Sequence, residues 1–312
     1  MIQKYSELTV FAPAKVNLHL AVKDKRPDGF HNLESIFLAV DFGDILHFFM
    51  KHEGESGSNM AEITMFWTDL IIQDSPIPQE KNIVFKALSL FRAKTNFSHD
   101  LEIKIEKRIP IGGGLGGGSS NAAAALLALN KLAGSPLGFE ALLELAAALG
   151  SDVPFFMYQT PAAKVTGRGE YIQPVDLPLK HFVLVNPGFE SDTASAFKLL
   201  DEHRSHEDFR REFYTGDFAS HSFFAPQSKS SMRLCKIKFY NDFLNVFNDP
   251  EKSIYNDMIA GLYKSGAEFA GLSGAGSSCF GVFSERETAQ RAAAALRDVY
   301  GFAEYCQTFY QA

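Results

Sequence analysis

Residues 110–121 read Pro-Ile-Gly-Gly-Gly-Leu-Gly-Gly-Gly-Ser-Ser-Asn, with six glycines in seven consecutive positions. A backbone without Cβ atoms can bring its N–H groups close to a ligand and point them at it. The ligand best suited to such a loop is an anion. The interpretation of the whole chain therefore begins with what flanks this glycine loop.

The flanking segments are typical of a strand and a helix. Leu101–Glu106 alternates apolar and polar residues with a period of two, as a strand does. Residues 121–134 are rich in alanine and leucine and favour a helix that stops at the final glycine. Ser119, Ser120 or Asn121 is available as the cap of this helix. A strand, a glycine loop and a helix N-terminus together predict a phosphate-binding site.

Three other interpretations of the glycine loop are weaker. A flexible surface loop would also be rich in glycine, but it would not need the flanking strand and capped helix. A Walker A loop requires a lysine before its final serine, and Gly118 stands before Ser119. A Rossmann unit requires a second parallel strand after the helix, whereas residues 139–149 again favour a helix. A different class of nucleotide-binding loop remains.

The run from Pro110 to Ala124 resembles the second motif of the GHMP kinases, the superfamily of galactokinase, homoserine kinase and mevalonate kinase. Its form is similar to one branch in particular, whose acceptor is a cytidyl diphosphate sugar alcohol. The resemblance implies that the ATP phosphates are bound by the loop. The residues implied are Pro110, Ile111, Gly112, Gly113, Gly114, Leu115, Gly116, Gly117, Gly118, Ser119 and Ser120.

The resemblance also implies a fold. An α+β chain with the two-domain GHMP kinase architecture is expected. Its N-terminal ATP-binding domain, residues 1–161, would be an α+β domain with a left-handed βαβ unit. Its C-terminal domain, residues 162–312, would be ferredoxin-like, with a polar insertion at about residues 202–238 that we interpret as an extended loop or lid.

Composition agrees with a folded, two-domain protein. A chain of 312 residues exceeds one ordinary core, and 46% hydrophobic with 21% charged residues is typical of globular proteins. No apolar run approaches the roughly 20 residues of a membrane span, and the N-terminus lacks the core of a signal peptide. A cytoplasmic protein, monomeric or weakly homodimeric and without a membrane partner, is expected.

Cysteine usage and charge exclude other classes. Cys235, Cys279 and Cys306 are an odd number at wide spacings, which favours reduced thiols over a disulfide framework or a zinc site. No dedicated metal site, with a carboxylate, thiolate or imidazole ligand, is predicted. The net charge of −7 disfavours a nucleic-acid partner, because such proteins need basic surfaces. A small anionic substrate needs only local positive potential.

The first strand-like run carries polar residues on alternate positions. Within residues 9–22, Lys15, Asn17 and His19 share one face, while the apolar residues between them share the other. A solvated strand face would look the same. The run also resembles the first GHMP motif, Pro-Ala-Lys-Ile/Val-Asn-Leu. That resemblance implies a catalytic Lys15 and a substrate-binding Asn17.

A tight turn follows at Pro27-Asp28-Gly29, which places Phe30 and His31 at its exit. An aromatic there could cover the edge of the core. The segment resembles Arg-Pro-Asp-Gly-Tyr-His of the cytidyl branch, whose aromatic and histidine hold the cytosine base. Here phenylalanine replaces tyrosine. Stacking, worth about 1–3 kcal/mol per base, is kept, and a phenol hydrogen bond of about 1 kcal/mol is lost.

Asp152 follows the predicted helix of residues 139–149. A carboxylate behind a helix C-terminus is unusual, because the carbonyl end of the dipole repels it. A turn residue that bonds its own backbone before Pro154 would explain it. The segment also resembles the family's Gly-Ala/Ser-Asp-Val-Pro-Phe, in which the aspartate is the catalytic carboxylate, and that resemblance implies a catalytic Asp152.

Residues of the C-terminal half complete the implied substrate site. Residues 270–283 form a second glycine-rich loop before a strand and resemble the third GHMP motif, where Cys279 is interpreted as a buried filler. Thr193 and Phe197 match positions beside the cytidine, although a helix cap and a core phenylalanine would explain them equally well. The substrate-binding residues implied are Asn17, Phe30, His31, Phe37, Thr193, Phe197, Gly274 and Gly276.

Several further elements are predicted from pattern alone. Residues 35–50 suggest two strands around Gly43-Asp44, and residues 82–94 favour a core helix. A hairpin is expected at 162–171, a strand at 181–185 and a helix from about Thr193. Residues 51–60 read as a polar loop, and Asn241 resembles the start of a helix in the second domain.

The function implied by the resemblance is ATP-dependent phosphorylation of the 2-hydroxyl of a cytidyl diphosphate sugar alcohol, in the methylerythritol phosphate route to isoprenoids. Asp152 would accept the proton of the attacking hydroxyl. Lys15 would supply the larger electrostatic stabilisation and keep Asp152 ionised. Mg²⁺ is expected with ATP, with Ser119 or Ser120 as a candidate ligand. Another GHMP acceptor, of the mevalonate or homoserine type, and a nucleotide-binding module without catalysis are the alternatives.

Overall fold

The structure is a computed structural model that describes residues 5–51, 60–67, 78–204 and 239–310. Its backbone groups into two compact units. The first unit comprises Met1–Ala14, Phe42–Ile111 and Gly116–Gln159, and the second comprises Lys15–Asp41, Gly112–Leu115 and Thr160–Ala312. The units interleave in sequence because β1 (Tyr5–Lys25) and β2 (His31–Lys51) contribute part of each strand to each unit. The predicted domain boundary between residues 161 and 162 stays a prediction.

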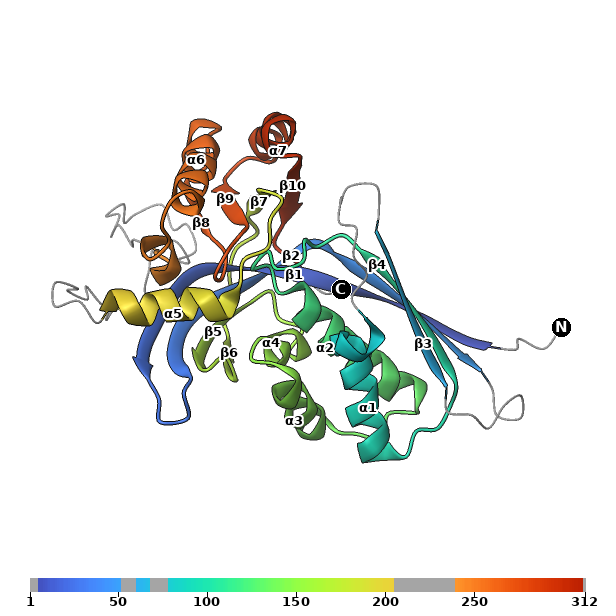
Figure 1. Cartoon of the computed structure of the whole chain (residues 1–312). Helices are drawn as coiled ribbons and strands as arrows, with labels where there is room; N and C mark the ends of the chain where they lie inside the picture. Colours follow the sequence, from blue (N-terminus) through green and yellow to red (C-terminus); the bar gives the residue numbers. More distant parts are fainter. Residues whose placement is uncertain (1–4, 52–59, 68–77, 205–238, 311–312) are drawn as a thin grey trace. The chain divides into compact units, whose positions relative to one another are not determined.

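The first unit combines strands with a group of helices (Figure 1). The second half of β2 pairs antiparallel with β4 (Leu101–Lys107), and β4 pairs in parallel with β3 (Ala61–Trp67). The helices that pack together in this unit are α1 (Ile83–Thr95), α2 (Gly117–Leu132), α3 (Phe139–Leu149) and α4 (Val153–Met157), and η1 (Gln79–Lys81) precedes α1. Because α1 follows β3 and precedes β4 in sequence, and these two strands pair in parallel, β3-α1-β4 forms the βαβ unit of the first unit.

Local signals explain where these elements begin and end. In β4 alternate side chains are buried, as its period of two predicts. The side chain of Asn82 caps α1 by accepting a hydrogen bond of 2.9 Å from the N–H of Val84, and α1 ends at Asn96 in the left-handed conformation. The predicted strand at 101–106 and the predicted helices at 82–94 and 139–149 are confirmed.

The prediction of two strands around Gly43 is wrong, because β2 is a single strand of 21 residues. A Cβ atom at Gly43 would overlap the carbonyl oxygen of Ala12 and lie 2.8 Å from Cα of Pro13. The glycine therefore permits a close approach to β1 and does not mark a turn. The sequence shows only that position 43 has no side chain. A turn and a close approach of β1 would each explain a glycine there.

Asp44 next to it has a structural role in the first unit. Its buried carboxylate pairs with Lys107 and accepts backbone hydrogen bonds from Arg108 (2.8 Å) and Ile109 (2.9 Å). These are the residues that lead from β4 into the glycine loop. Because a buried carboxylate needs such partners, the residue that suggested a turn instead anchors the entry to the loop.

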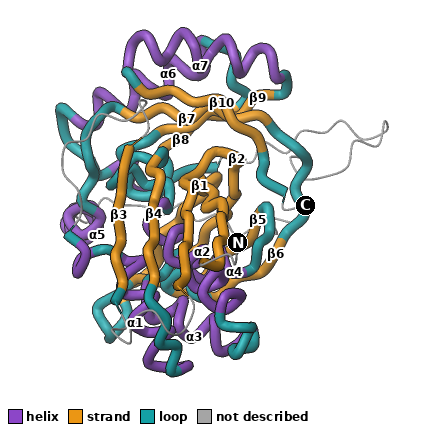
Figure 2. The backbone as a smooth tube through the Cα atoms, turned by 90° about the vertical axis from the view of Figure 1, so that its right-hand side faces the viewer, coloured by secondary structure: helices purple, strands orange, loops and turns teal. Residues whose placement is uncertain are grey.

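The second unit contains a four-stranded antiparallel sheet in the order β10-β7-β9-β8. The elements β7, α6, β8, β9, α7 and β10 follow the order strand, helix, two strands, helix, strand of the predicted ferredoxin-like arrangement, with α5 and η3 placed between β7 and α6. Helices α6 and α7 lie together on one side of this sheet (Figure 2). The bounds are β7 (His181–Asn186), α6 (Glu251–Lys264), β8 (Phe269–Leu272), β9 (Cys279–Phe283), α7 (Arg286–Tyr300) and β10 (Phe302–Gln307).

The remaining elements of this unit match most predictions. The hairpin consists of β5 (Ala162–Gly167) and β6 (Tyr171–Pro174), and β5 pairs with the first half of β2. Helix α5 (Thr193–Arg204) begins at the expected residue, and Asn241 caps the short 3₁₀ helix η3 (Asp242–Asn245). Because α5 continues to Arg204, residues 202–204 are helix and not part of a loop. Residues 205–238, with Cys235, and residues 52–59 lie outside the described residues.

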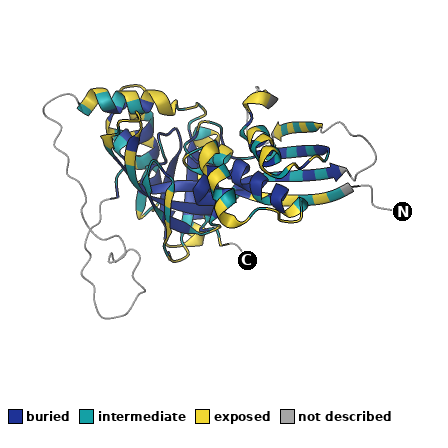
Figure 3. Cartoon of the chain, turned by 90° about the horizontal axis from the view of Figure 1, so that it is seen from below, coloured by how far each residue is buried: buried dark blue, intermediate teal, exposed yellow. Residues whose placement is uncertain are grey.

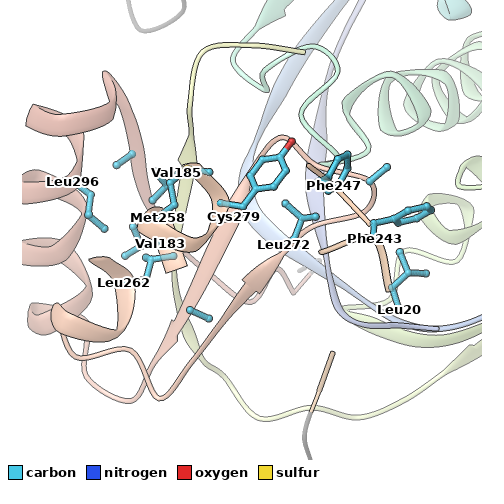
Figure 4. Close-up of a cluster of buried hydrophobic side chains, with 14 of the residues drawn as sticks. Leu20, Val183, Val185, Phe243, Phe247, Met258, Leu262, Leu272, Cys279 and Leu296 are labelled. Carbon is cyan, nitrogen blue, oxygen red and sulfur yellow. The ribbon is translucent and has the colours of Figure 1, made fainter. Parts of the chain in front are cut away.

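The core of the second unit joins its sheet, its helices and β1. Leu20 of β1, Phe243 of η3, Leu272 of β8 and Cys279 of β9 belong to the same cluster of buried side chains (Figure 4). Exposed residues occupy the outward sides of the helices, while buried ones concentrate in the strands (Figure 3). Cys279 is fully buried, which confirms its interpretation as a filler.

Candidate active site

The polar residues of β1 are buried, so the solvated-face interpretation is wrong. Lys15 and Asn17 are each 3% exposed and His19 is 2% exposed, although they alternate with buried apolar residues. Both faces of this part of β1 are covered, and sequence alternation alone cannot show that. A buried cation and two buried polar groups require partners within the protein or in a ligand.

The ammonium of Lys15 has two neighbours in the second unit. Its Nζ donates a hydrogen bond of 2.6 Å to Oδ1 of Asn17 and lies 4.6 Å from the ring centroid of Phe37. A desolvated cation over an aromatic face gains about 2 kcal/mol. The backbone N–H of Lys15 donates to the carbonyl of Leu115 at 2.9 Å. The first motif is therefore attached to the part of the glycine loop that belongs to this unit.

Asn17 continues this network. Its Nδ2 donates to Oγ of Ser35 at 3.0 Å, and its backbone N–H donates to Oγ of Ser273 at 3.4 Å. The hydroxyl of Ser273 in turn donates to the carbonyl of Gly114 at 2.9 Å. Residues that are 256 positions apart, Asn17 and Ser273, thus connect the first motif with both glycine-rich loops.

The second-unit part of the glycine loop, Gly112–Leu115, lies against the loop of residues 273–278. The backbone N–H of Ser278 donates to the carbonyl of Gly113 at 3.1 Å. A Cβ atom on Gly114, whose φ is +73°, would overlap the carbonyl oxygens of Ser273 and Gly276. Glycine at position 114 is required for backbone-to-backbone packing, in addition to any approach to a ligand. Gly274 and Gly276 lie in this contact with φ of +58° and +85°.

The first-unit part of the loop ends in the first turn of α2. The predicted side-chain cap is wrong, because Gly116 with φ of +71° occupies the N-cap position and makes no side-chain hydrogen bond. Helix α2 begins at Gly117, so Ser119, Ser120 and Asn121 lie inside its first turns. The sequence missed this start because glycine is a poor helix former, and the requirement for backbone conformation outweighs propensity here.

Two buried polar atoms in these turns have no hydrogen-bond partner among the described residues. They are Oγ of Ser120, which can donate and accept, and Oδ1 of Asn121, which can only accept. Buried polar atoms without partners are rare and point to a missing ligand or water. The hydroxyl of Ser120 can donate to a phosphate group at this helix N-terminus, together with the backbone N–H groups of the first turn. Oδ1 of Asn121 can only accept, so it would need a donor such as water.

Asp152 belongs to the first unit, where it occupies the N-cap position of α4 and is half-buried. Its side chain makes no capping hydrogen bond to α4. The aspartate lies behind α3 and also opens α4, so the helix end nearest to it in sequence favours a negative charge. Lys15 belongs to the second unit, and the joint action of the two residues stays a proposal.

The second group of predicted residues surrounds His31. The turn at residues 27–29 is confirmed, and the N–H of Arg26 donates to the carbonyl of Phe30 at 2.6 Å. Phe30 is 51% exposed, and the guanidinium of Arg168 lies 4.8 Å from its ring centroid. His31 is buried and stacks on Phe197 with ring centroids 5.2 Å apart and planes 16° from parallel. Thr193 is exposed at the start of α5.

Sequence reasoning missed Asp201, which holds the ring of His31. Oδ1 of Asp201 lies 2.7 Å from Nε2 of His31, and Nζ of Lys25 donates to Oδ2 at 2.7 Å. Thr193, Phe197 and Asp201 are spaced by four residues, so they share one stripe of α5. The spacing indicates that Asp201 lies on the same face of α5 as the predicted Thr193 and Phe197. It does not reveal which residue elsewhere in the chain contacts that face.

Burial of His19 predicts a pH dependence of stability. Burial lowers the pKa of His19 from 6.5 to about 4. The unfolded chain therefore binds this proton first as the pH falls, and the folded state loses stability between pH 6.5 and pH 4. We expect a loss of about 2 kcal/mol between pH 7 and pH 5 from this residue.

Urea unfolding at pH 7 and pH 5 measures that loss. His19→Gln keeps an acceptor for the N–H of Tyr240, which lies 3.5 Å from Nδ1, but cannot titrate. The variant should therefore lose about 2 kcal/mol less than the wild type over this interval. Equal losses in the two proteins would contradict the assignment to His19.

Neither a metal cluster nor a membrane helix is found in the described part of the chain. Across residues 5–51, 60–67, 78–204 and 239–310, no three His, Cys, Asp or Glu side chains gather as they would around a metal ion. The helices of the same ranges are too short or too polar to cross a bilayer.

Two family models match the chain. The model of the GHMP kinases N terminal domain matches residues 82–160, and the model of the GHMP kinases C terminal matches residues 242–301. The first match contains the glycine loop and Asp152, and the second contains the loop of Gly274 and Gly276. The two GHMP kinase models thus match the chain at the places that its motifs indicated.

Two curated relatives that share one name match part of the chain. The chain is 41% identical over 186 residues to 4-diphosphocytidyl-2-C-methyl-D-erythritol kinase of Burkholderia thailandensis, a match that covers 60% of this chain and 59% of the relative. It is 42% identical over 187 residues to the enzyme of the same name from Burkholderia mallei, again over 60% and 59%. The match thus spans about three fifths of the length of these relatives.

Solved structures match the fold over nearly the whole chain. A crystal structure of 4-(cytidine 5'-diphospho)-2C-methyl-D-erythritol kinase has a TM-score of 0.73 and 28% identity, and covers 96% of this chain and 98% of its own. Homoserine kinase from Cytophaga hutchinsonii has a TM-score of 0.61 at 18% identity, with 99% and 96% covered. The second likeness concerns the fold alone. The predicted α+β, two-domain GHMP kinase fold is confirmed.

Proposed function

We propose that this protein is an ATP-dependent kinase that phosphorylates the 2-hydroxyl of 4-diphosphocytidyl-2-C-methyl-D-erythritol, in the methylerythritol phosphate route to isoprenoid precursors. The observation that carries the proposal is the aromatic group of the second unit. A buried His31 stacked on Phe197, beside an exposed Phe30, provides what a cytosine base needs and what a GHMP kinase for a small alcohol does not.

ATP supplies the phosphoryl group, and the glycine loop is the proposed site of its phosphates. The unpartnered Oγ of Ser120 and the first-turn N–H groups of α2 fit this role. Mg²⁺ is proposed to accompany ATP and to neutralise phosphate charge, with Ser120 as the candidate protein ligand. The proposed phosphate contacts are those of residues 110–120.

Lys15 and Asp152 are the proposed catalytic residues. Phosphoryl transfer requires positioning and charge stabilisation, because the protein forms no covalent bond to the phosphate. Lys15 is positioned by Asn17 and Phe37 and would stabilise the negative charge of the transferring group. Asp152 would accept the proton of the attacking 2-hydroxyl. Asn17 is proposed to orient Lys15 and to contact the acceptor.

A coupled assay of ADP release tests this function. Cytidyl diphosphate sugar alcohols should support ADP release, and mevalonate, homoserine and the free sugar alcohol should not. Turnover of a non-cytidyl alcohol alone would identify another GHMP specificity. ATP binding without ADP release on any acceptor would identify a nucleotide-binding module. We further propose a cytoplasmic monomer or weak homodimer that has no nucleic-acid partner, in keeping with its net charge of −7.

Phe30→Ala should raise the KM for the cytidyl substrate by about 5- to 150-fold, because stacking on an aromatic contributes about 1–3 kcal/mol per base. The KM for ATP should not change. Phe30→Tyr should retain the wild-type constants. Steady-state kinetics with each substrate varied in turn measure both constants.

The control for this variant is Phe66→Ala, which removes a similarly exposed phenylalanine from β3 in the first unit. It should leave both constants unchanged. If Phe30→Ala raised the two KM values equally, Phe30 would serve the fold and not the base.

A further inference from the structure

Asp201 restrains the one histidine of the proposed cytosine site. Its Oδ1 lies 2.7 Å from Nε2 of His31, whose side chain is only 5% exposed. Phe197 covers a face of the same ring, at 5.2 Å between centroids. Both restraints come from one stripe of α5, where Phe197 and Asp201 are four residues apart. The stacking contact with Phe197 fixes the plane of the imidazole ring. The hydrogen bond to Asp201 fixes the rotation of the ring within that plane.

The charges around Asp201 decide which nitrogen of His31 carries the proton. Burial acts to raise the pKa of Asp201, and hydrogen bonds from Lys25 and His31 outweigh it, so the pKa lies below its usual value. The carboxylate is therefore ionised at neutral pH and can only accept hydrogen bonds. An acceptor at Oδ1 requires the proton of the imidazole to be on Nε2.

Lys25 supplies a positive charge that pairs with Asp201. Its ammonium lies 2.7 Å from Oδ2 of Asp201 and already balances the carboxylate. A neutral imidazole with its proton on Nε2 has a lone pair on Nδ1. Among the described residues Asp201 is the hydrogen-bond partner of the His31 ring, which leaves Nδ1 for a ligand.

We propose that Asp201 is a positioning residue that makes His31 present Nδ1 as a hydrogen-bond acceptor, so that the site binds the 4-amino group of cytosine and rejects uracil. Cytosine offers an N–H donor at position 4, whereas uracil offers a carbonyl oxygen there. Two acceptors facing each other would leave both without a partner, and a site of this kind discriminates by at least tenfold. The inference rests on the proposed function, because it assumes that this group receives a cytidyl substrate.

Binding of CDP and UDP tests the proposal. Isothermal titration in the presence of saturating AMP-PNP, which occupies the ATP site, gives the Kd of each nucleotide. The wild type should bind CDP at least about tenfold more tightly than UDP. In Asp201→Asn the side-chain amide can donate to Nε2, so the ring can carry its proton on Nδ1. The CDP preference should then fall to about threefold or less.

Two further variants separate positioning from a structural effect. Glu202→Gln removes the neighbouring carboxylate of α5, which pairs with Lys198 at 3.8 Å. It should keep the wild-type preference. Asp201→Glu should restore part of the preference lost in Asp201→Asn. The KM for ATP should be the same in all three variants.

Nitrogen-15 NMR of the histidine rings tests the tautomer directly, with His31→Gln used to assign the signal. The wild type should show the proton of the neutral ring on Nε2, and Asp201→Asn should shift it towards Nδ1. A wild-type ring protonated on Nδ1, or a full CDP preference in Asp201→Asn, would overturn the proposal.

The outcomes also separate this inference from the proposed function. Turnover of the cytidyl alcohol with an unchanged CDP preference in Asp201→Asn removes the inference alone. A lost CDP preference without turnover of any cytidyl alcohol removes the proposed activity and keeps the role of Asp201. If the wild type binds neither CDP nor UDP, both are overturned.

Discussion

Asp152→Asn is expected to abolish phosphoryl transfer, with a fall in kcat of at least about 10²–10⁴, the usual contribution of a general base. The amide keeps the size of the carboxylate but cannot accept the proton of the attacking hydroxyl. The Kd values for ATP and for the cytidyl substrate should stay within a few-fold of wild type, because proton acceptance acts in the transition state. Single-turnover kinetics and equilibrium titration measure the two effects separately.

The matched control is Glu140→Gln, which neutralises an exposed carboxylate in the first turn of α3, in the same unit. It should retain wild-type kcat. Near-normal turnover in Asp152→Asn would remove this residue from the chemistry. A loss of both activity and substrate binding would assign Asp152 to positioning of a substrate.

Lys15→Met should lower kcat by about 10³, since a cation about 4 Å from a developing charge contributes about 4 kcal/mol at an effective dielectric near 20. Methionine is flexible and fills a similar volume, so it can keep the packing against Phe37. It leaves Oδ1 of Asn17 without the hydrogen bond of 2.6 Å that Lys15 donates. The KM for the cytidyl substrate should change less than kcat.

Lys23→Met is the control for this effect. Lys23 lies on the same strand, with its side chain 44% exposed and paired with Glu34. Exposed pairs contribute about 0–1 kcal/mol, so both activity and stability should stay near wild type. If Lys15→Met kept kcat within threefold, the buried ammonium would serve the fold alone. Thermal unfolding of both variants distinguishes a chemical loss from a folding defect.

Local patterns in the sequence predicted much of the fold. The alternation in β4 and the helical periodicity of α1 and α3 gave their positions, because each pattern is set by the environment of a single element. Gly43 shows the limit of this reasoning. Its role depends on the closeness of the backbone at Ala12, which no local pattern records.

In the candidate site, too, local motifs were predictable from the sequence and tertiary contacts were not. Motifs identified Lys15, Asn17, Phe30 and His31, and the structure adds the contacts that hold them. The partner of His31 was missed because Asp201 is 170 residues away in sequence and is an ordinary residue on an amphipathic helix. The cap predicted at residues 119–121 was wrong because the loop's backbone geometry, set by tertiary packing, determines where α2 begins.

The two described cysteines have a practical consequence. Cys279 of β9 and Cys306 of β10 lie in the two strands that flank β7, and both are at most 1% exposed. Burial raises the pKa of both thiols, so the thiolate that alkylating reagents attack is scarce in the folded protein. Modification at either position therefore requires the C-terminal sheet to open, and peptide mass spectrometry of iodoacetamide-treated samples makes these cysteines natural probes of how often it does so.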